Sequence, residues 1–287
     1  MGASFGDDLR ISQLGISQLD PADLPTLEAV FARHHFRPSH RLGQNFLVDP
    51  ALRDRVAEEL SPGPDDAVLE VGAGPGTLTV ALARSAGRVV AVEIDRRLLG
   101  VLREVVGADR RVELVEGDVL KLPLPALPLV AGNIPYYLTG ALLPRLLDRP
   151  DRPRRLGLVV QKEVAERWTA PGDWSLATLS VQVFAVPELR FELHRSAFWP
   201  EPAVDSALVV LEVRPKPALE VSSLSDFFRF AERVFQFRRK QLGGILARLG
   251  ASAAAARAGI DPSRRPQTLA LSEWEALYRA YEEAQLK

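Results

Sequence analysis

An acidic residue followed by closely spaced glycines stands in the first third of the chain, in the segment Glu70-Val-Gly72-Ala-Gly74-Pro-Gly76. Glycines let a backbone turn tightly and approach a ligand closely because they carry no Cβ atom. The spacing is G-x-G-x-G, whereas a dinucleotide site uses G-x-G-x-x-G to bring a helix N-terminus to a pyrophosphate. Glu70 would repel a pyrophosphate, but it suits a ligand that carries an amino group and a sulfonium. We therefore expect S-adenosylmethionine here rather than NAD or an empty glycine-rich turn.

Two more carboxylates follow the next predicted strands. Glu93 stands at the end of the second strand, in Val92-Glu-Ile-Asp95, and Asp118 follows Gly117 after the third strand. A carboxylate at the end of the second strand can accept hydrogen bonds from both ribose hydroxyls. A carboxylate after the third strand can accept a bond from an adenine amino group. These features, in this order, indicate a site for a cofactor that carries a nucleoside.

The segment Gly132-Asn133-Ile-Pro135-Tyr136-Tyr137 ends the fourth predicted strand and suits an exocyclic amine on a base. Such an amine is a poor nucleophile because its lone pair is delocalised into the ring. The Asn133 amide oxygen and a nearby backbone carbonyl can accept its two N–H bonds, which favours a pyramidal nitrogen whose lone pair faces a methyl sulfonium. Pro135 holds the turn rigid, and Tyr136 offers a ring on which a flipped base can stack. Taken alone, the segment could also be a strand-end turn with a packed tyrosine.

The elements that must position these groups alternate between strand and helix. Strands are predicted at residues 67–71, 88–92, 112–116, 127–131 and 156–161, and helices at residues 78–86, 96–106, 140–147 and 162–168. Late β-rich runs follow at residues 175–184 and 207–213. This order predicts an α/β fold with a parallel sheet and helices on both faces. Ligands of such sheets bind outside the carboxyl ends of the strands, where the glycines, the carboxylates and Asn133 all stand.

The chain changes character after Arg214-Pro-Lys-Pro217, a proline-broken stretch typical of a linker. Helical periodicity without strand-like runs follows at residues 227–249, 251–258 and 272–285. We therefore predict an N-terminal extension at residues 1–36, loosely ordered over residues 1–24, an α/β domain at residues 37–213 and a helical domain at residues 214–287. The helical part holds thirteen Lys and Arg against eight Asp and Glu, which suggests a partner surface.

Composition excludes several other kinds of site. The 287 residues are 47% hydrophobic and 25% charged, as is typical of a soluble globular protein. The absence of cysteine excludes disulfides, thiol catalysis and Cys-ligated zinc, and four scattered histidines predict no metal site. The N-terminus does not resemble a secretory signal, and no apolar run is long enough to cross a membrane. We therefore expect a cytoplasmic monomer. The sequence also lacks a nucleophile elbow, a P-loop lysine and an H-E-x-x-H motif.

From about Arg41 to the C-terminus, the chain resembles the ribosomal RNA adenine N6,N6-dimethyltransferases of the KsgA type and, less closely, the Erm resistance methyltransferases. The core segments described above match the family's motifs in order. Further matching segments are Arg41-Leu-Gly-Gln-Asn-Phe-Leu47, Gln161-Lys-Glu-Val-Ala-Glu-Arg167, Phe198-Trp-Pro-Glu-Pro-Ala-Val-Asp-Ser206, the predicted helix Phe237-Arg-Arg-Lys240, and Arg265-Pro266. The resemblance implies a Rossmann-like S-adenosylmethionine methyltransferase sheet with a smaller C-terminal all-helical domain that recognises rRNA.

The resemblance also assigns roles to individual residues. Asn133 and Tyr136 would orient the target adenine, and Phe198 would close over the other face of the base, unless it is a core residue beside a proline-rich turn. The target implied is a pair of adjacent adenines near the 3′ end of small-subunit rRNA in an assembling subunit, each dimethylated. Contacts with S-adenosylmethionine would come from Gln44, Asn45, Leu47, Gly72, Gly74, Glu93, Asp118 and Asn133.

Some features leave alternatives open. Ile134 stands where the family most often has Leu, and Ile is also common in Erm enzymes, so a large-subunit rRNA target is the second hypothesis. A non-catalytic ribosome-assembly factor and an NAD-dependent oxidoreductase are the other two. A net charge of −1 implies that RNA would bind to a local basic face. The candidate RNA-binding residues, which could equally be solvated helix surface, are Arg152, Arg154, Arg155, Arg238, Arg239 and Lys240.

Overall fold

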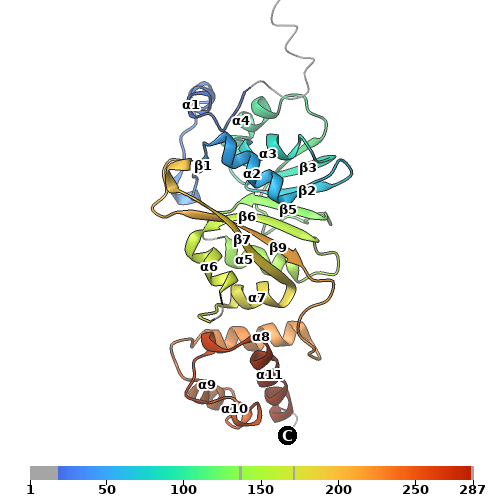
Figure 1. Ribbon diagram of the computed structural model, residues 1–287, viewed down its shortest axis with the longest axis vertical. Helices are drawn as coiled ribbons and strands as arrows, with labels where there is room; N and C mark the ends of the chain where they lie inside the picture. The colour runs from blue at the N-terminus through green and yellow to red at the C-terminus, as the bar shows by residue number, and fades with distance from the viewer. Residues whose placement is uncertain (1–18, 136–137, 171, 286–287) are drawn as a thin grey trace, which may run out of the picture.

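The computed structural model describes residues 19–135, 138–170 and 172–285, and its centre is a seven-stranded sheet in the order β4-β3-β2-β5-β6-β9-β7 (Figure 1). The strands from β2 to β6 run parallel, and β9 is antiparallel to both β6 and β7. The bounds are β2 Ala67–Val71, β3 Arg88–Glu93, β4 Val112–Glu116, β5 Leu129–Asn133, β6 Arg155–Gln161, β7 Ala185–Leu193 and β9 Ser206–Val213. The α/β prediction is confirmed.

The strand order reverses between β2 and β5. From β2 the chain adds β3 and then β4 on one side, and it returns to place β5 on the other side of β2. The carboxyl ends of β2 and β5 therefore flank the point where an open parallel sheet binds its ligands. Gly72 follows β2 and Asn133 ends β5, so the two sequence features predicted to meet are brought to one crevice.

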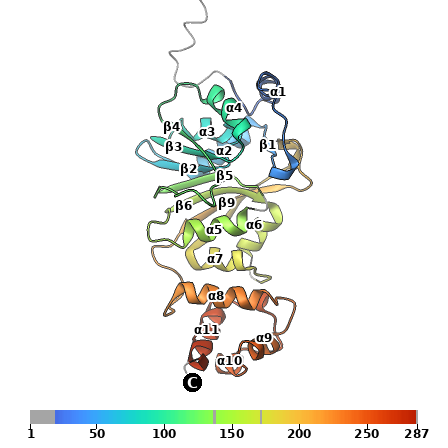
Figure 2. The ribbon, with the colours of Figure 1, turned by 180° about the vertical axis from the view of Figure 1, so that it is seen from behind.

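Helices cover both faces of the sheet (Figures 1 and 2). One face carries α2 (Pro50–Leu60), α3 (Thr77–Leu82) and α4 (Arg96–Val106); the other carries α5 (Thr139–Leu147), α6 (Lys162–Thr169) and α7 (Leu176–Phe184). Successive side chains of a strand point to opposite faces. Along β2, Val68 accordingly packs with the α2–α4 layer, while Leu69 and Val71 pack with the α5–α7 layer.

The N-terminal residues 19–36 pack against the α/β body. Asp23 caps α1 (Leu24–Arg33) by accepting a hydrogen bond from the backbone N–H of Thr26. The ring of Phe31 lies 5.4 Å from that of Phe46, centroid to centroid. Asp20 forms an ion pair with the buried Arg53 of α2. The predicted looseness is therefore wrong for residues 19–24, whereas residues 1–18 lie outside the described part.

Two predicted elements are wrong. Residues 175–184 form helix α7, capped by the Ser175 hydroxyl, which accepts a bond from the Thr178 N–H. Much of this helix is buried, so its apolar residues show no clear period that would separate helix from strand. The segment Phe237–Lys240 is not helical: it is a turn between α8 (Leu224–Phe235) and α9 (Leu242–Arg248). This turn returns the chain to the core, where Leu242 is fully buried.

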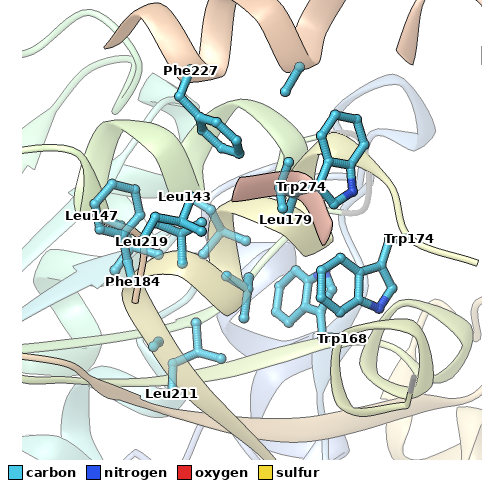
Figure 3. Close-up of a cluster of buried hydrophobic side chains, with 14 of the residues drawn as sticks. Leu143, Leu147, Trp168, Trp174, Leu179, Phe184, Leu211, Leu219, Phe227 and Trp274 are labelled. Carbon is cyan, nitrogen blue, oxygen red and sulfur yellow. The ribbon is translucent and has the colours of Figure 1, made fainter. Parts of the chain in front are cut away.

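The helices α8, α9, α10 (Ala254–Arg257) and α11 (Leu271–Gln285) lie beyond the α5–α7 layer. They share an apolar core with that layer, because Phe227 and Trp274 belong to the same cluster as Leu143, Leu179 and Phe184 (Figure 3). Division of the chain near residue 214 stays a prediction. In the described ranges, no helix combines the length and apolarity needed to cross a membrane.

Candidate active site

A cavity of about 160 Å³ opens at the switch point of the sheet. Its walls are the turns after β2, β3, β4 and β5, and a loop at residues 42–46 closes one side. Seven of the eight predicted cofactor residues line it: Gln44, Asn45, Gly72, Gly74, Glu93, Asp118 and Asn133. The eighth, Leu47, lines an adjoining cavity of about 40 Å³ that shares Gly72, Gly74 and Asn133 with the first.

The glycine turn has a backbone that side chains would disturb. Gly72, Gly74 and Gly76 have φ values of 73°, 59° and 94°, in the left-handed region. A Cβ atom on Gly74 would lie 3.3 Å from the Phe46 ring, and one on Gly76 would lie 2.8 Å from a methyl of Leu102. Side chains at Gly74 and Gly76 would therefore crowd Phe46 and Leu102. Without them, the backbone of the turn can be approached closely by a ligand.

Glu93 holds this turn in place. One carboxylate oxygen accepts a hydrogen bond from the Gly74 N–H at 2.8 Å, and the other accepts one from the Asp95 N–H at 2.7 Å. Burial raises the pKa of Glu93. On the next turn, Asp118 accepts a bond from the Leu120 N–H at 2.9 Å and lines the same cavity. Both carboxylates thus stand where the nucleoside of a cofactor was predicted.

Glu70 is a buried carboxyl group that lines the smaller cavity. Its Oε2 atom has no hydrogen-bond partner among the described residues. Burial raises its pKa to about 8; the charge of Glu93 acts in the same direction, and the Thr79 hydroxyl opposes it. Buried polar atoms are rarely left without a partner, so an incoming group that donates hydrogen bonds and carries positive charge fits this position.

Asn133 and the loop at residues 42–46 are joined directly. The Asn133 Nδ2 donates to the carbonyl oxygen of Asn45 at 2.9 Å. Gln44 secures the loop, because its Nε2 donates to Asp95 at 2.9 Å and its Oε1 accepts from the Ser39 N–H at 2.8 Å. Beyond the loop, β1 (Phe46–Leu47) pairs with β8 (Phe198–Trp199). The carboxamide of Asn133 is thereby held beside the glycine turn.

The structure places the two predicted aromatic residues differently. Phe198 is only 4% exposed, pairs with Leu47 across β1 and β8, and belongs to the apolar cluster of the α2–α4 layer. Within the described part of the chain, Phe198 is not in the lining of either cavity. Its position matches the alternative of a core residue, because its ring is buried where a stacking face was expected. Tyr136 lies outside the described residues.

The first basic cluster lies away from the cavity. Arg155 begins β6, at the opposite end of the parallel strands from Asn133. Its Nε lies 2.9 Å from Glu212, Arg154 lies 2.9 Å from Asp66, and the Arg152 guanidinium lies 5.1 Å from the ring centre of Phe184. These three side chains are thus engaged within the protein. Arg238, Arg239 and Lys240 are instead exposed in the turn between α8 and α9.

Sequence reasoning missed the apolar wall of the cavity. Ile94 lines it and is 50% exposed, which is unusual for a large aliphatic side chain in this fold. Phe46, Leu98, Leu120 and Leu138 are further apolar residues of this lining. The one available signal was an isoleucine directly after the carboxylate that ends β3, where a polar turn residue is more usual.

The segments that line this cavity, including the glycine turn and Asn-Ile-Pro, lie within the part of the chain that matches a known family. The family model "Ribosomal RNA adenine dimethylase" matches residues 34–283. This chain belongs to that family. The resemblance seen in the sequence is thereby confirmed, and this adenine dimethylase is a methyltransferase.

Relatives of the dimethylase cover most of its length. A "Ribosomal RNA small subunit methyltransferase A" of Pelotomaculum thermopropionicum is 39% identical in an alignment 280 residues long. The match covers 89% of this chain and 95% of the relative. A protein of the same name from Geobacter metallireducens is 40% identical over 266 residues, covering 85% and 95%.

Solved structures of similar proteins agree with the fold of the dimethylase. The 23S rRNA methyltransferase ErmE is 32% identical with a TM-score of 0.66, covering 83% of this chain and 100% of that chain. A dimethyladenosine transferase from Plasmodium falciparum is 23% identical with a TM-score of 0.68, covering 84% and 98%. The predicted Rossmann-like methyltransferase fold is confirmed.

Proposed function

We propose that this dimethylase transfers methyl groups from S-adenosylmethionine to N6 of two adjacent adenines near the 3′ end of small-subunit rRNA, during assembly of the subunit in the cytoplasm. Support comes from the relatives named for the small subunit, which are 39% and 40% identical over most of both chains. The single structural observation that carries the proposal is the Asn133 carboxamide at the carboxyl end of β5, beside the glycine turn that follows β2.

The residues around the two cavities fit S-adenosylmethionine. The unpartnered Oε2 of Glu70 suits the ammonium group of the methionine part, and the bare backbone of Gly72 and Gly74 leaves room for that part to approach. Glu93 would accept the ribose hydroxyls, and Asp118 would accept the adenine amino group. When bound, the cofactor supplies a methyl group on a positively charged sulfur.

We assign to Asn133 the task of preparing the acceptor nitrogen. Its Nδ2 is engaged with Asn45, so its Oδ1 is the atom left to accept an N–H of the adenine amine. Such a bond favours a pyramidal nitrogen, whose lone pair is less delocalised into the ring and would face the methyl group. With the cofactor bound, the new N–C bond would form as the S–C bond breaks, and the nitrogen would then release its extra proton to solvent. Leu47 and Gln44 act by holding the loop that bears Asn45.

For the RNA, we propose that Arg238, Arg239 and Lys240 contact phosphates, because the turn between α8 and α9 exposes all three. Each phosphate contact of this kind steepens the dependence of RNA affinity on salt. Arg152, Arg154 and Arg155 remain a weaker proposal, since their guanidinium groups are already engaged with the protein. Tyr136 remains a candidate for stacking on the target base, whereas the buried ring of Phe198 favours the alternative of a core residue.

Product mapping tests the function and separates it from the Erm-like alternative. The protein would be incubated with labelled S-adenosylmethionine and either small-subunit or large-subunit particles that lack adenine dimethylation. Mass spectrometry of nuclease digests would then locate the modified residues. The proposal expects N6,N6-dimethyladenine at two adjacent positions in the small-subunit RNA. Label confined to large-subunit RNA would support the alternative, and no label in either RNA would contradict both.

A further inference from the structure

A second concave site lies between α8 and α11, in the part of the molecule farthest from the sheet (Figure 1). This groove has a volume of about 460 Å³. Its lining residues combine aromatic rings, guanidinium groups and carboxylates: Asp226, Arg229, Phe230, Arg233, Tyr278, Tyr281, Glu282 and Gln285. None of these residues takes part in the active site described above.

One ring in this groove is held as a platform. Tyr281 is half-buried and stacks on the buried Phe230, with ring centres 4.5 Å apart and planes inclined by 30°. Its hydroxyl oxygen lies 3.3 Å from Arg233 Nη1, which donates to it. Tyr278, whose ring is inclined by 28° to that of Tyr281, adds a further aromatic wall. A ring fixed by two neighbours has little conformational freedom left to lose when a planar ligand stacks on it.

The polar groups around this ring are balanced in charge. Arg229 has a side chain that is 74% exposed and forms an ion pair with Asp226. Glu282 accepts a hydrogen bond from the Ser222 hydroxyl. A site for a bare anion would hold cations without carboxylates beside them. The mixture found here instead favours a ligand that carries both hydrogen-bond donors and hydrogen-bond acceptors. A nucleobase has both on its edges and a flat face for the tyrosine, while its phosphates suit arginine.

We propose that the groove between α8 and α11 binds an unpaired rRNA base stacked on Tyr281, with Arg229 and Arg233 on the adjoining phosphates. This inference rests on the proposed function, since it takes rRNA as the substrate. The site is a contact remote from the chemistry, and it would raise affinity for the folded particle without touching the reacting atoms. The surplus of Lys and Arg in residues 214–287 favours a negatively charged partner, and the stacked Tyr281 ring favours RNA over an acidic protein.

The test compares Tyr281→Leu, which removes the ring, with Tyr281→Phe, which keeps it. Affinity for small-subunit particles and steady-state methylation would both be measured. We expect Tyr281→Leu to raise Kd and KM about tenfold with kcat at saturation unchanged, and Tyr281→Phe to stay within about twofold of the wild type. Ultraviolet crosslinking followed by mass spectrometry should also join an rRNA nucleotide to residues of α11 in the wild type.

A charge variant keeps the proposal testable should Tyr281→Leu unfold. Arg229→Gln should reduce the slope of log affinity against log salt by about one. The matched control is Arg279→Gln on α11, because this guanidinium binds Glu275 and the Glu220 carbonyl outside the groove; its slope should not change.

Three results would overturn the groove proposal: unchanged Kd and salt slope in folded groove variants, absence of a crosslink on α11, or a dimer in sedimentation that Tyr281→Leu dissociates. Methylation by the wild type in the same assay reports on the proposed function separately.

Discussion

The side-chain amide of Asn133 donates a hydrogen bond to the backbone carbonyl of Asn45, across 88 positions of the sequence. The bond joins the end of β5 to the loop at residues 42–46, so the N-terminal loop determines which way the carboxamide faces. A carboxamide whose nitrogen is already engaged presents its oxygen as an acceptor. In the proposed mechanism, this relationship makes the loop part of the catalytic arrangement as well as a wall of the cavity.

Removal of the Gln44 side chain should therefore slow methyl transfer. Gln44→Ala loses the bonds to Asp95 and to the Ser39 N–H, and each such bond contributes about 1 kcal/mol. With the loop less firmly held, we expect the single-turnover rate of methyl transfer to fall about tenfold or more, while the loss of two bonds lowers Tm by only a few degrees. A variant with the wild-type single-turnover rate would show that the loop does not position Asn133.

The packing around the glycine turn predicts how substitutions there change the free energy of unfolding. Gly76→Ala places a Cβ atom 2.8 Å from Leu102 at a φ of 94°, and we expect it to destabilise the fold by about 2 kcal/mol. Gly140→Ala is the matched control, because Gly140 lies exposed in α5 with no atom within 4 Å of the new Cβ among the described residues. It should stabilise slightly. Urea unfolding measures the stability of both variants, and equal midpoints would contradict the backbone strain and crowding at Gly76.

Burial of Glu70 predicts how stability depends on pH. Its pKa is about 8 in the folded protein and near 4.5 in the unfolded chain. Between about pH 5 and about pH 8 the folded state therefore keeps a proton that the unfolded state has lost, so stability falls as pH rises. Glu70→Gln should flatten this fall, because the amide does not ionise. The urea midpoint across this range is the measurement, and parallel curves for both proteins would contradict it. The pKa of Glu93 is also raised by burial, and Glu93 is present in both proteins.

The shared core predicts that the C-terminal helices unfold together with the sheet. Phe227 is fully buried in the apolar cluster that also contains Leu179 and Phe184 of α7, so Phe227→Ala should cost about 3–5 kcal/mol. Phe228→Ala probes the same interface from a partly buried position, because the Phe228 ring stacks on that of Phe184 in α7 at 5.7 Å, and it should cost less. Calorimetry should show one transition that moves to lower temperature. Two separate transitions, with only one affected by Phe227→Ala, would indicate that the helices form an independent domain.

The sequence was most informative where short local patterns end a strand. The glycine turn, Glu93, Asp118 and Asn133 each follow a strand at its carboxyl end, and parallel strands bring such ends together. Prediction failed where tertiary packing decides. The helix at residues 176–184 is buried on most sides, with Thr178 and Ser180 among its buried residues, so its apolar residues show no helical period. The Asn45–Asn133 bond depends on the path of a loop 88 residues away, which no local pattern encodes.

The central claim is that the Asn133 carboxamide oxygen prepares the adenine nitrogen for methyl transfer. Single-turnover transfer of labelled methyl to undermethylated small-subunit particles by Asn133→Ala, with particle binding measured in parallel, tests it most directly. We predict that the rate falls by about a hundredfold or more while the particles still bind. A wild-type rate in this variant would contradict the claim.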